Sequence, residues 1–180
     1  KNKSLIENTE FVNMSNINNE RFIFTGGVTA YQSEIDFKNV TLKNSICEDS
    51  LNIVRSNFNI ENIILKNSES DAIDIDFSNG IMNNIKILNS NNDGLDISGS
   101  EIKIKNIHIK NSKDKGISIG EDSNIEINSL KINGSFVAIA NKDGSKAKIS
   151  NAELRNAKYD FAGFKKKNEY SGSITEIVRL

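Results

Sequence analysis

The chain has 180 residues, the length of one domain, and its 23 Lys and Arg are balanced by 24 Asp and Glu to give a formal net charge of -1. This balance argues against nucleic acid as a partner, because binding to phosphates needs a basic excess. No apolar run approaches the roughly 18 residues that a membrane-spanning helix requires, so we expect no membrane span.

Residues 1–35 are expected to form irregular N-terminal coils with an inserted loop at residues 20–27. Asn13 and Asn18 repeat a five-residue spacing that recurs further along the chain. The chain starts at Lys rather than Met, which suggests a missing upstream segment and leaves a secretion signal open. The lone Cys47 is expected to be a buried, small apolar residue rather than half of an internal disulfide.

A repeat of about 22 residues dominates the rest of the chain. The phrase NIILKNS at residues 62–68 returns as NIKILNS at 84–90 and as NIHIKNS at 106–112, an interval of 22 residues each time. Equivalent Asn residues are expected to stack as two structural ladders at corners of the chain, since Asn tolerates left-handed backbone geometry. The first ladder comprises Asn39, Asn62, Asn84, Asn106, Asn128 and Asn151, and the second comprises Asn44, Asn67, Asn89, Asn111, Asn133 and Asn156.

Each repeat holds three short alternating runs and has no room for a helix, which excludes a leucine-rich repeat. Residues 81–87, 95–97 and 102–104 are the three runs of one copy. We therefore predict an all-β fold, a single-stranded right-handed parallel β-helix over residues 36–180. No capping helix is visible, so we expect a piece of a longer protein, or end-to-end contacts with the rest of a larger chain or another subunit.

Three acidic segments carry a resemblance to a known family: DAIDID at 71–76, NDGLDI at 92–97 and DKGISIGE at 114–121. They resemble coils of bacterial right-handed parallel β-helix proteins with pectate-lyase-like repeats. This resemblance implies a secreted or cell-surface location and a polysaccharide substrate. NNDG at 91–94 is similar to a segment of the polygalacturonase-type hydrolases, but their doubled Asp on the next coil, Gly-His-Gly and Arg-Ile-Lys motifs are absent.

The strand after the second Asn ladder is expected to present its alternate residues to solvent in columns. One column runs through Asp74, Asp96, Ser118, Ala140 and Gly163, and a second through Asp76, Ser98, Gly120, Lys142 and Lys165. A corner column before the strand runs through Asp71, Asp93, Lys115, Val137 and Asp160. Like charges stacked one coil apart should raise the pKa of one member, which supplies an acid and a base in one site.

These columns define the candidate site. Asp74, Asp96, Asp76 and Asp93 are the candidate catalytic residues, and Asp71, Ser98, Ser118, Lys115 and Lys142 the candidate substrate-binding residues. Three interpretations stay open: hydrolytic, lyase or epimerase chemistry; binding of sugar or of Ca²⁺ by Asp71, Asp74, Asp93 and Asp96 without chemistry; and a merely solvated acidic face. No other cofactor is expected.

His108 is expected to lie at the surface, in a separate mixed column with Thr41, Ile64, Lys86, Leu130 and Glu153. The sequence thus favours a domain that binds or processes a carbohydrate polymer along one face with clustered Asp residues. The alternative is a non-catalytic structural or adhesive solenoid of a larger surface protein. Fold alone does not decide between them.

Overall fold

A computed structural model describes residues 3–15 and 24–180, and within these residues every regular element is a β-strand. No helix long and apolar enough to cross a membrane occurs in this part of the chain. The strands are β1 (Ser4–Val12), β2 (Gly26–Tyr31), β3 (Glu34–Ser45), β4 (Asp49–Val54), β5 (Asn57–Ser68), β6 (Asp71–Asp76), β7 (Asn79–Ser90), β8 (Leu95–Ser98), β9 (Glu101–Gly120), β10 (Asn124–Lys142), β11 (Lys146–Phe164) and β12 (Ile174–Ile177).

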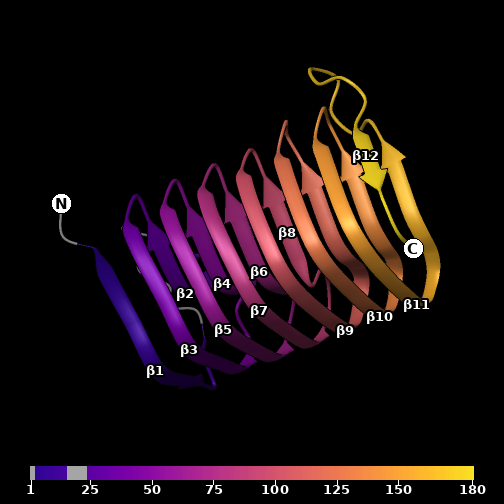
Figure 1. Ribbon diagram of the computed structural model, residues 1–180. Coiled ribbons are helices and arrows are strands. Elements are labelled where there is room, and N and C mark those ends of the chain that lie inside the picture. Colours follow the sequence, from indigo (N-terminus) through magenta and orange to yellow (C-terminus); the bar gives the residue numbers. More distant parts are fainter. Residues whose placement is uncertain (1–2, 16–23) are drawn as a thin grey trace.

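The strands wind into a parallel β-solenoid of about 22 residues per turn, which confirms the predicted all-β repeat fold (Figure 1). Long strands stack in the order β1, β3, β5, β7, β9, and short strands stack in the order β2, β4, β6, β8. In β9, β10 and β11 the long and short segments merge into one continuous strand of 19 or 20 residues. Every strand pair is parallel, and the two termini lie at opposite ends of the stack.

Each turn presents three faces, which we number along the chain. In the turn that starts with β7, the first face is residues 79–83, the second is residues 85–88, and the third is β8. Corners with a positive φ separate them: Asn84 at 57°, Asn89 at 63° and, after the third face, Gly99 at 60°. Asn and Gly adopt this conformation at low energy, so the sequence repeat fixes where the chain turns.

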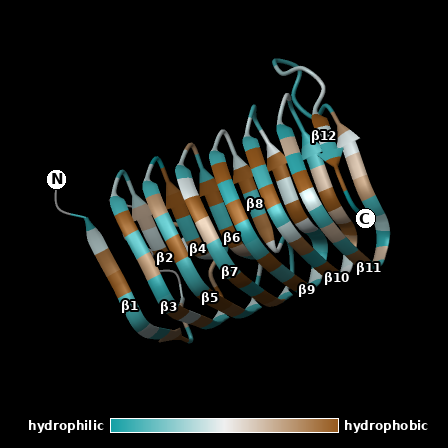
Figure 2. Cartoon of the chain, viewed as in Figure 1, coloured by the Kyte–Doolittle hydropathy of each residue, from teal (hydrophilic) through white to brown (hydrophobic). Residues whose placement is uncertain are grey.

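The core lies inside the solenoid and is built mainly from Ile. Ile63, Ile85 and Ile107 are register neighbours on successive turns, and none is more than 2% exposed. Side chains alternate between the core and solvent along each strand, which gives the alternating brown and teal bands of Figure 2. Cys47 is 2% exposed and unpaired, which confirms its expected burial.

Two Asn ladders run along the corners as predicted, but their ends differ from the prediction. Asn84 donates a hydrogen bond to Asn62 at 2.9 Å, and Asn89 donates one to Asn67 at 3.0 Å. Further such bonds join Asn39 to Asn8, Asn62 to Asn39, Asn106 to Asn84, Asn44 to Asn13, Asn67 to Asn44, and Asn111 to Asn89. The ladders therefore staple the coils together at their edges.

The sequence predicts the five-residue spacing of the first coil at Asn13 and Asn18, and this phase is wrong. Asn8 and Asn13 hold the two ladder positions, because the turn between them and the next coil is longer than 22 residues. Asn18 lies outside the described residues, as do residues 20–23 of the expected loop, whereas Gly26 already belongs to β2.

The first ladder is also wrong at its C-terminal end. Ser129, not Asn128, is the register partner of both Asn106 and Asn151. In the second ladder, Gly134 with a φ of 87° lies against Asn111, so Asn133 is displaced by one position. The register between β9 and β10 then shifts between Ser135 and Val137, which restores the phase of the third face.

A third ladder, built from buried Ser residues, follows the corner after the third face and was not predicted. Ser56 donates its backbone N–H to the hydroxyl of Ser78 at 3.0 Å, and Ser78 does the same to Ser100 at 2.9 Å. Ser100 and Ser123 continue the series to Ser145. These hydroxyls satisfy buried backbone donors at a corner where the sheet hydrogen bonds are interrupted.

Candidate functional site

The third face brings the predicted aspartates together. Asp74 of β6 and Asp96 of β8 are direct register neighbours, as are Asp76 and Ser98. Neighbouring parallel strands lie about 4.8 Å apart, so the outward side chains of the two coils share one surface. The predicted stacking of Asp74 on Asp96 is therefore confirmed.

Asp71 and Asp93 stack at the corner that leads into this face, and they bind backbone as well as each other's coil. The carboxylate of Asp71 accepts the backbone N–H of Asp93 at 2.7 Å, and that of Asp93 accepts the backbone N–H of Lys115 at 2.9 Å. The ammonium of Lys115 lies 3.3 Å from Asp93 and also contacts Asp114. Asp93 is only 2% exposed, so this corner column supports the chain as well as lining the site.

Burial sets the ionisation of the corner carboxyls. It raises the pKa of Asp71 to about 6 and that of Asp93 to about 7, although Lys115 opposes the rise at Asp93. Burial favours the neutral form of Lys115, but the contacts with Asp114 and Asp93 outweigh it, and the pKa of Lys115 rises. Half of the Asp93 population is thus neutral near physiological pH.

Asp74 lies at the centre of the acidic surface. Its carboxyl accepts a hydrogen bond from the side-chain amide of Asn52 at 3.0 Å. Burial, with the charges of Asp76, Asp49 and Asp96, raises the pKa of Asp74 to about 9. The pKa of Asp76 is raised too, mainly by burial and Asp96, while a hydrogen bond with Asp74 opposes the rise. At neutral pH Asp74 is therefore a protonated group beside an acceptor, which confirms the expectation that one carboxyl in this column has a raised pKa.

The acidic surface extends one coil further toward the N-terminus than predicted. Asp49 pairs in register with Asp71, and Asn52 pairs with Asp74. Asp49 is 3% exposed, and burial raises its pKa to about 6. Stepping back by 22 residues from Asp71 and Asp74 reaches both positions, so the repeat itself carried the signal.

Toward the C-terminus the columns become small and then basic. Ser118 is the register partner of Asp96, and the ammonium of Lys142 donates a hydrogen bond to the Ser118 hydroxyl at 2.8 Å. The Lys142 side chain lies over Gly120, where a Cβ atom would approach within 2.8 Å of it. Ser118 and Lys142 are both buried, so in this conformation they close the C-terminal end of the acidic surface.

The last members of the three predicted columns are wrong by one residue. Ala162 stands where Gly163 was predicted, Phe164 replaces Lys165, and Tyr159 replaces Asp160. The final repeat is one residue out of phase with the earlier ones, so counting in steps of 22 overshoots the register that the sheet hydrogen bonds impose. Lys165 lies beyond β11 and has no place in the site.

A pocket of about 490 Å³ opens at the N-terminal end of the third face. Aromatic side chains stand on one side of it and carboxyl and amide groups on the other. Tyr31 is 52% exposed at its rim. The lining comprises Phe24, Thr25, Thr29, Tyr31, Glu48, Asp49, Asn52, Val54, Asp74 and Asp76. Such a cavity pairs a stacking surface with convergent hydrogen-bonding groups.

Within the described residues, no group of three or more His, Cys, Asp or Glu side chains is arranged to hold a metal ion. Ca²⁺ at Asp71, Asp74, Asp93 and Asp96 stays a prediction of the sequence. One oxygen of Asp96 is buried and accepts no hydrogen bond from the described part of the chain. The carboxyls of this face nevertheless differ in ionisation at neutral pH, which is the condition for proton transfer between an acid and a base.

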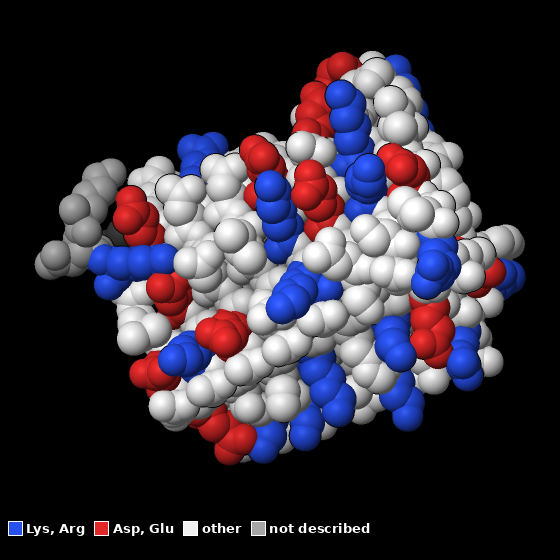
Figure 3. All heavy atoms as spheres, viewed as in Figure 1, with Lys and Arg blue, Asp and Glu red and all other residues white. Residues whose placement is uncertain are grey.

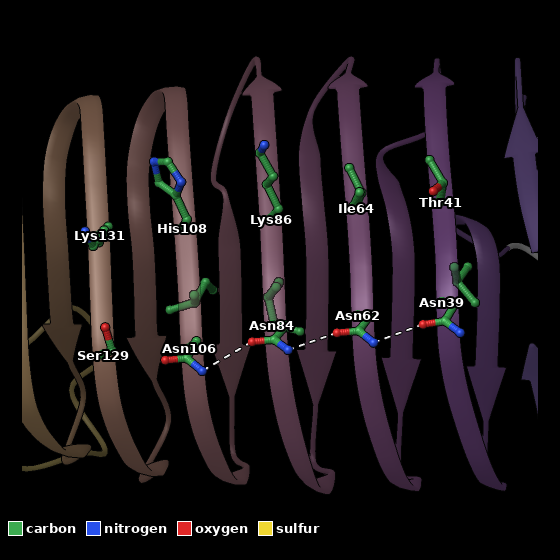
Figure 4. Close-up of a pocket in the computed structure, with 13 residues that line it drawn as sticks. Asn39, Thr41, Asn62, Ile64, Asn84, Lys86, Asn106, His108, Ser129 and Lys131 are labelled. Atoms are coloured by element: carbon green, nitrogen blue, oxygen red, sulfur yellow. Dashed lines mark hydrogen bonds between the residues drawn. The ribbon is translucent and has the colours of Figure 1, made fainter. Parts of the chain in front are cut away.

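His108 lies on the second face and not with the acidic surface, as expected. Its column was predicted to continue through Leu130, but Leu130 is buried and Lys131 is the register partner of His108. The row of Thr41, Ile64, Lys86, His108 and Lys131 beside the Asn ladder is visible in Figure 4. The one-residue shift at Ser129 accounts for the difference.

No protein-family profile matches the chain, and neither a curated protein nor a solved structure matches it significantly. The β-solenoid is confirmed by its geometry alone. The pectate-lyase-like family and the bacterial source stay predictions that rest on the resemblance of the acidic coils.

Proposed function

We propose that the third face binds a carbohydrate polymer, with one sugar residue seated in the pocket between Tyr31 and the carboxyl groups of Asp49, Asp74 and Asp76. The observation that carries this proposal is the composition of that pocket. An exposed phenol ring offers a flat apolar surface to the C–H face of a sugar. The neutral and ionised carboxyls opposite it offer both donors and acceptors to sugar hydroxyl groups.

The polymer lies along the solenoid axis in this proposal. The outward residues that follow the pocket are Asp96, Ser98 and Ser118, register neighbours of the pocket residues or of one another. Short side chains at these positions let a ring approach the sheet, and each coil advances about 4.8 Å. Because such polymers belong to cell surfaces and secretions, the proposal includes a secreted or cell-surface location.

Asp74 is the candidate acid if the bound polymer is also processed. Its pKa of about 9 keeps it protonated at neutral pH, whereas Asp49 with a pKa of about 6 is mostly ionised. A proton donor and an acceptor on one surface serve hydrolysis, elimination or epimerisation alike. Asp96 is the next carboxyl along the axis and takes part in the same exchange of charge.

The test of binding is titration calorimetry against a panel of neutral and acidic polysaccharide oligomers. For the oligomer that binds, Tyr31→Ala should raise Kd about tenfold, since it removes roughly 1 to 2 kcal/mol of stacking. The matched control is Glu61→Gln, an exposed acid on the first face, which should leave Kd unchanged. Absence of binding across the panel, or equal Kd for wild type and Tyr31→Ala, would reject the proposal.

Asp74→Asn separates binding from chemistry. The amide keeps a neutral donor next to Asp76 but cannot release a proton, so binding should persist within about threefold. If reducing ends or unsaturated sugars are released by wild type, Asp74→Asn should abolish that release. Binding without any turnover in wild type favours the alternative of a non-catalytic, adhesive solenoid.

A further inference from the structure

The second face is basic, in contrast to the acidic third face. Six basic side chains alternate outward along its strands: Lys43, Lys66, Lys86, Lys110, Lys131 and Arg155. His108 lies between Lys86 and Lys131 in one row. The chain as a whole has a formal charge of -1, so this is a segregation of charge and not a general excess. On the side shown in Figure 3, basic side chains gather along the lower edge, whereas acids and bases are interspersed above it.

Ion pairs neutralise the two ends of this basic face but not its centre. Lys43 pairs with Glu10, and Lys131 and Arg155 pair with Glu153. Among residues 3–15 and 24–180, no carboxylate lies within ion-pairing distance of Lys66, Lys86 or Lys110. The centre of the face therefore presents uncompensated positive charge to solvent.

A groove of about 610 Å³ runs along the same face, parallel to the solenoid axis. The Asn39 to Asn106 ladder forms one wall, and the row from Thr41 to Lys131 forms the other (Figure 4). The Asn amides bond to one another along the wall, which leaves each with one N–H free for a ligand. The groove thus combines lysine charges with a line of amide donors.

We propose that this groove binds a linear anionic glycan laid along the solenoid axis. The site is separate from the third face and goes beyond the function proposed for it. Cations that recur on coils about 4.8 Å apart match charges that recur along a sugar chain. Duplex nucleic acid is a poorer fit, since it carries one charge per roughly 1.7 Å, and no aromatic ring of the groove offers a platform for stacked bases.

The experiment uses chondroitin sulfate oligosaccharides as the probe, with binding measured by titration calorimetry at several salt concentrations. The double variant Lys86→Gln with Lys131→Gln removes both lysines that line the groove and should raise Kd about tenfold, with a shallower salt dependence. The matched control is Lys103→Gln with Lys148→Gln, which removes the same charge from exposed, ion-paired lysines of the first face. This control should change Kd by less than about threefold.

Three outcomes would overturn the proposal. The first is no binding of the probe by wild type, and the second is an equal loss in the two double variants. The third is tighter binding of an oligothymidylate than of the probe, which would assign the groove to nucleic acid instead. Asp74→Asn should leave this binding unchanged, so failure of this site and failure of the third-face site are distinguishable.

Discussion

The second and third faces of the solenoid arise from the same repeat yet present opposite chemistry. Both alternate core and solvent positions along parallel strands, but one carries unpaired lysines and the other stacked aspartates. Lysine reaches water over its long stem, whereas the short carboxyls of Asp49 and Asp93 stay 2 to 3% exposed at the sheet surface. The comparison teaches that outward columns of equal geometry differ in ionisation because side-chain length decides access to water.

The pH dependence of stability offers the largest effect with which to test this difference. Burial raises the pKa of Asp49 and Asp71 to about 6, of Asp93 to about 7 and of Asp74 to about 9. The unfolded chain loses these protons near pH 4, so the stabilisation is complete below that pH and is lost as pH rises through the folded pKa values.

We therefore expect the free energy of unfolding to fall by about 2 kcal/mol or more from pH 5 to pH 9, measured by urea denaturation. Asp74→Asn should flatten the curve between pH 7 and pH 9, because its amide does not titrate. A free energy that stays constant or rises over this range would show that the third-face carboxyls are as well hydrated as the second-face lysines.

Asp93→Ala should destabilise the protein by about 1 to 3 kcal/mol, the usual effect of leaving a buried donor unpaired. The backbone N–H of Lys115 would lose its acceptor, and the ammonium of Lys115 would lose one of its two carboxylate contacts. Thermal unfolding at constant pH measures the loss. Asp93→Asn keeps an acceptor oxygen and should recover most of it; equal losses in both variants would point to charge and not to the hydrogen bond.

Asn89→Ala probes the corner that separates the two faces and should cost about 1 to 2 kcal/mol. Asn89 has a φ of 63° and is hydrogen-bonded to Asn67 and Asn111. Alanine strains the left-handed backbone and interrupts the ladder. Asn89→Gly relieves the strain and loses only the ladder bonds, so chemical denaturation should rank it between wild type and Asn89→Ala.

Lys66→Gln on the second face should give the smallest effect, within about 0.5 kcal/mol, since exposed charges contribute little to stability. Parallel denaturation curves for Lys66→Gln and wild type would match this expectation. A larger loss would reveal that the second face, like the third, has a role in holding its coils together.

Much of the fold followed from the sequence because neighbouring coils repeat the same local choices. Asn at the corners fixes where the chain turns, and alternating Ile fixes which side faces the core. In the phase of 22 residues, Asp74 necessarily meets Asp96, and Asp71 meets Asp93. These contacts were predictable since each depends only on the number of residues per turn.

The tertiary structure decided what a constant period cannot express. A corner absorbs one extra residue at Ser129 and Gly134, so Lys131 and not Leu130 stands beside His108. The first coil is longer still, which moves its ladder to Asn8 and Asn13. Sheet hydrogen bonds between coils set the register, and they are indifferent to how many residues a corner contains.

The character of the site was also a tertiary property. Periodicity identifies Asp74 as an outward residue, but its pKa depends on how many neighbours exclude water from it and on the carboxyls of three coils around it. The pocket beside Tyr31 forms only because β2 lies next to β4 in the stack. Sequence spacing determined which side chains are neighbours, whereas desolvation, a many-body effect of packing, determined which of them hold their protons.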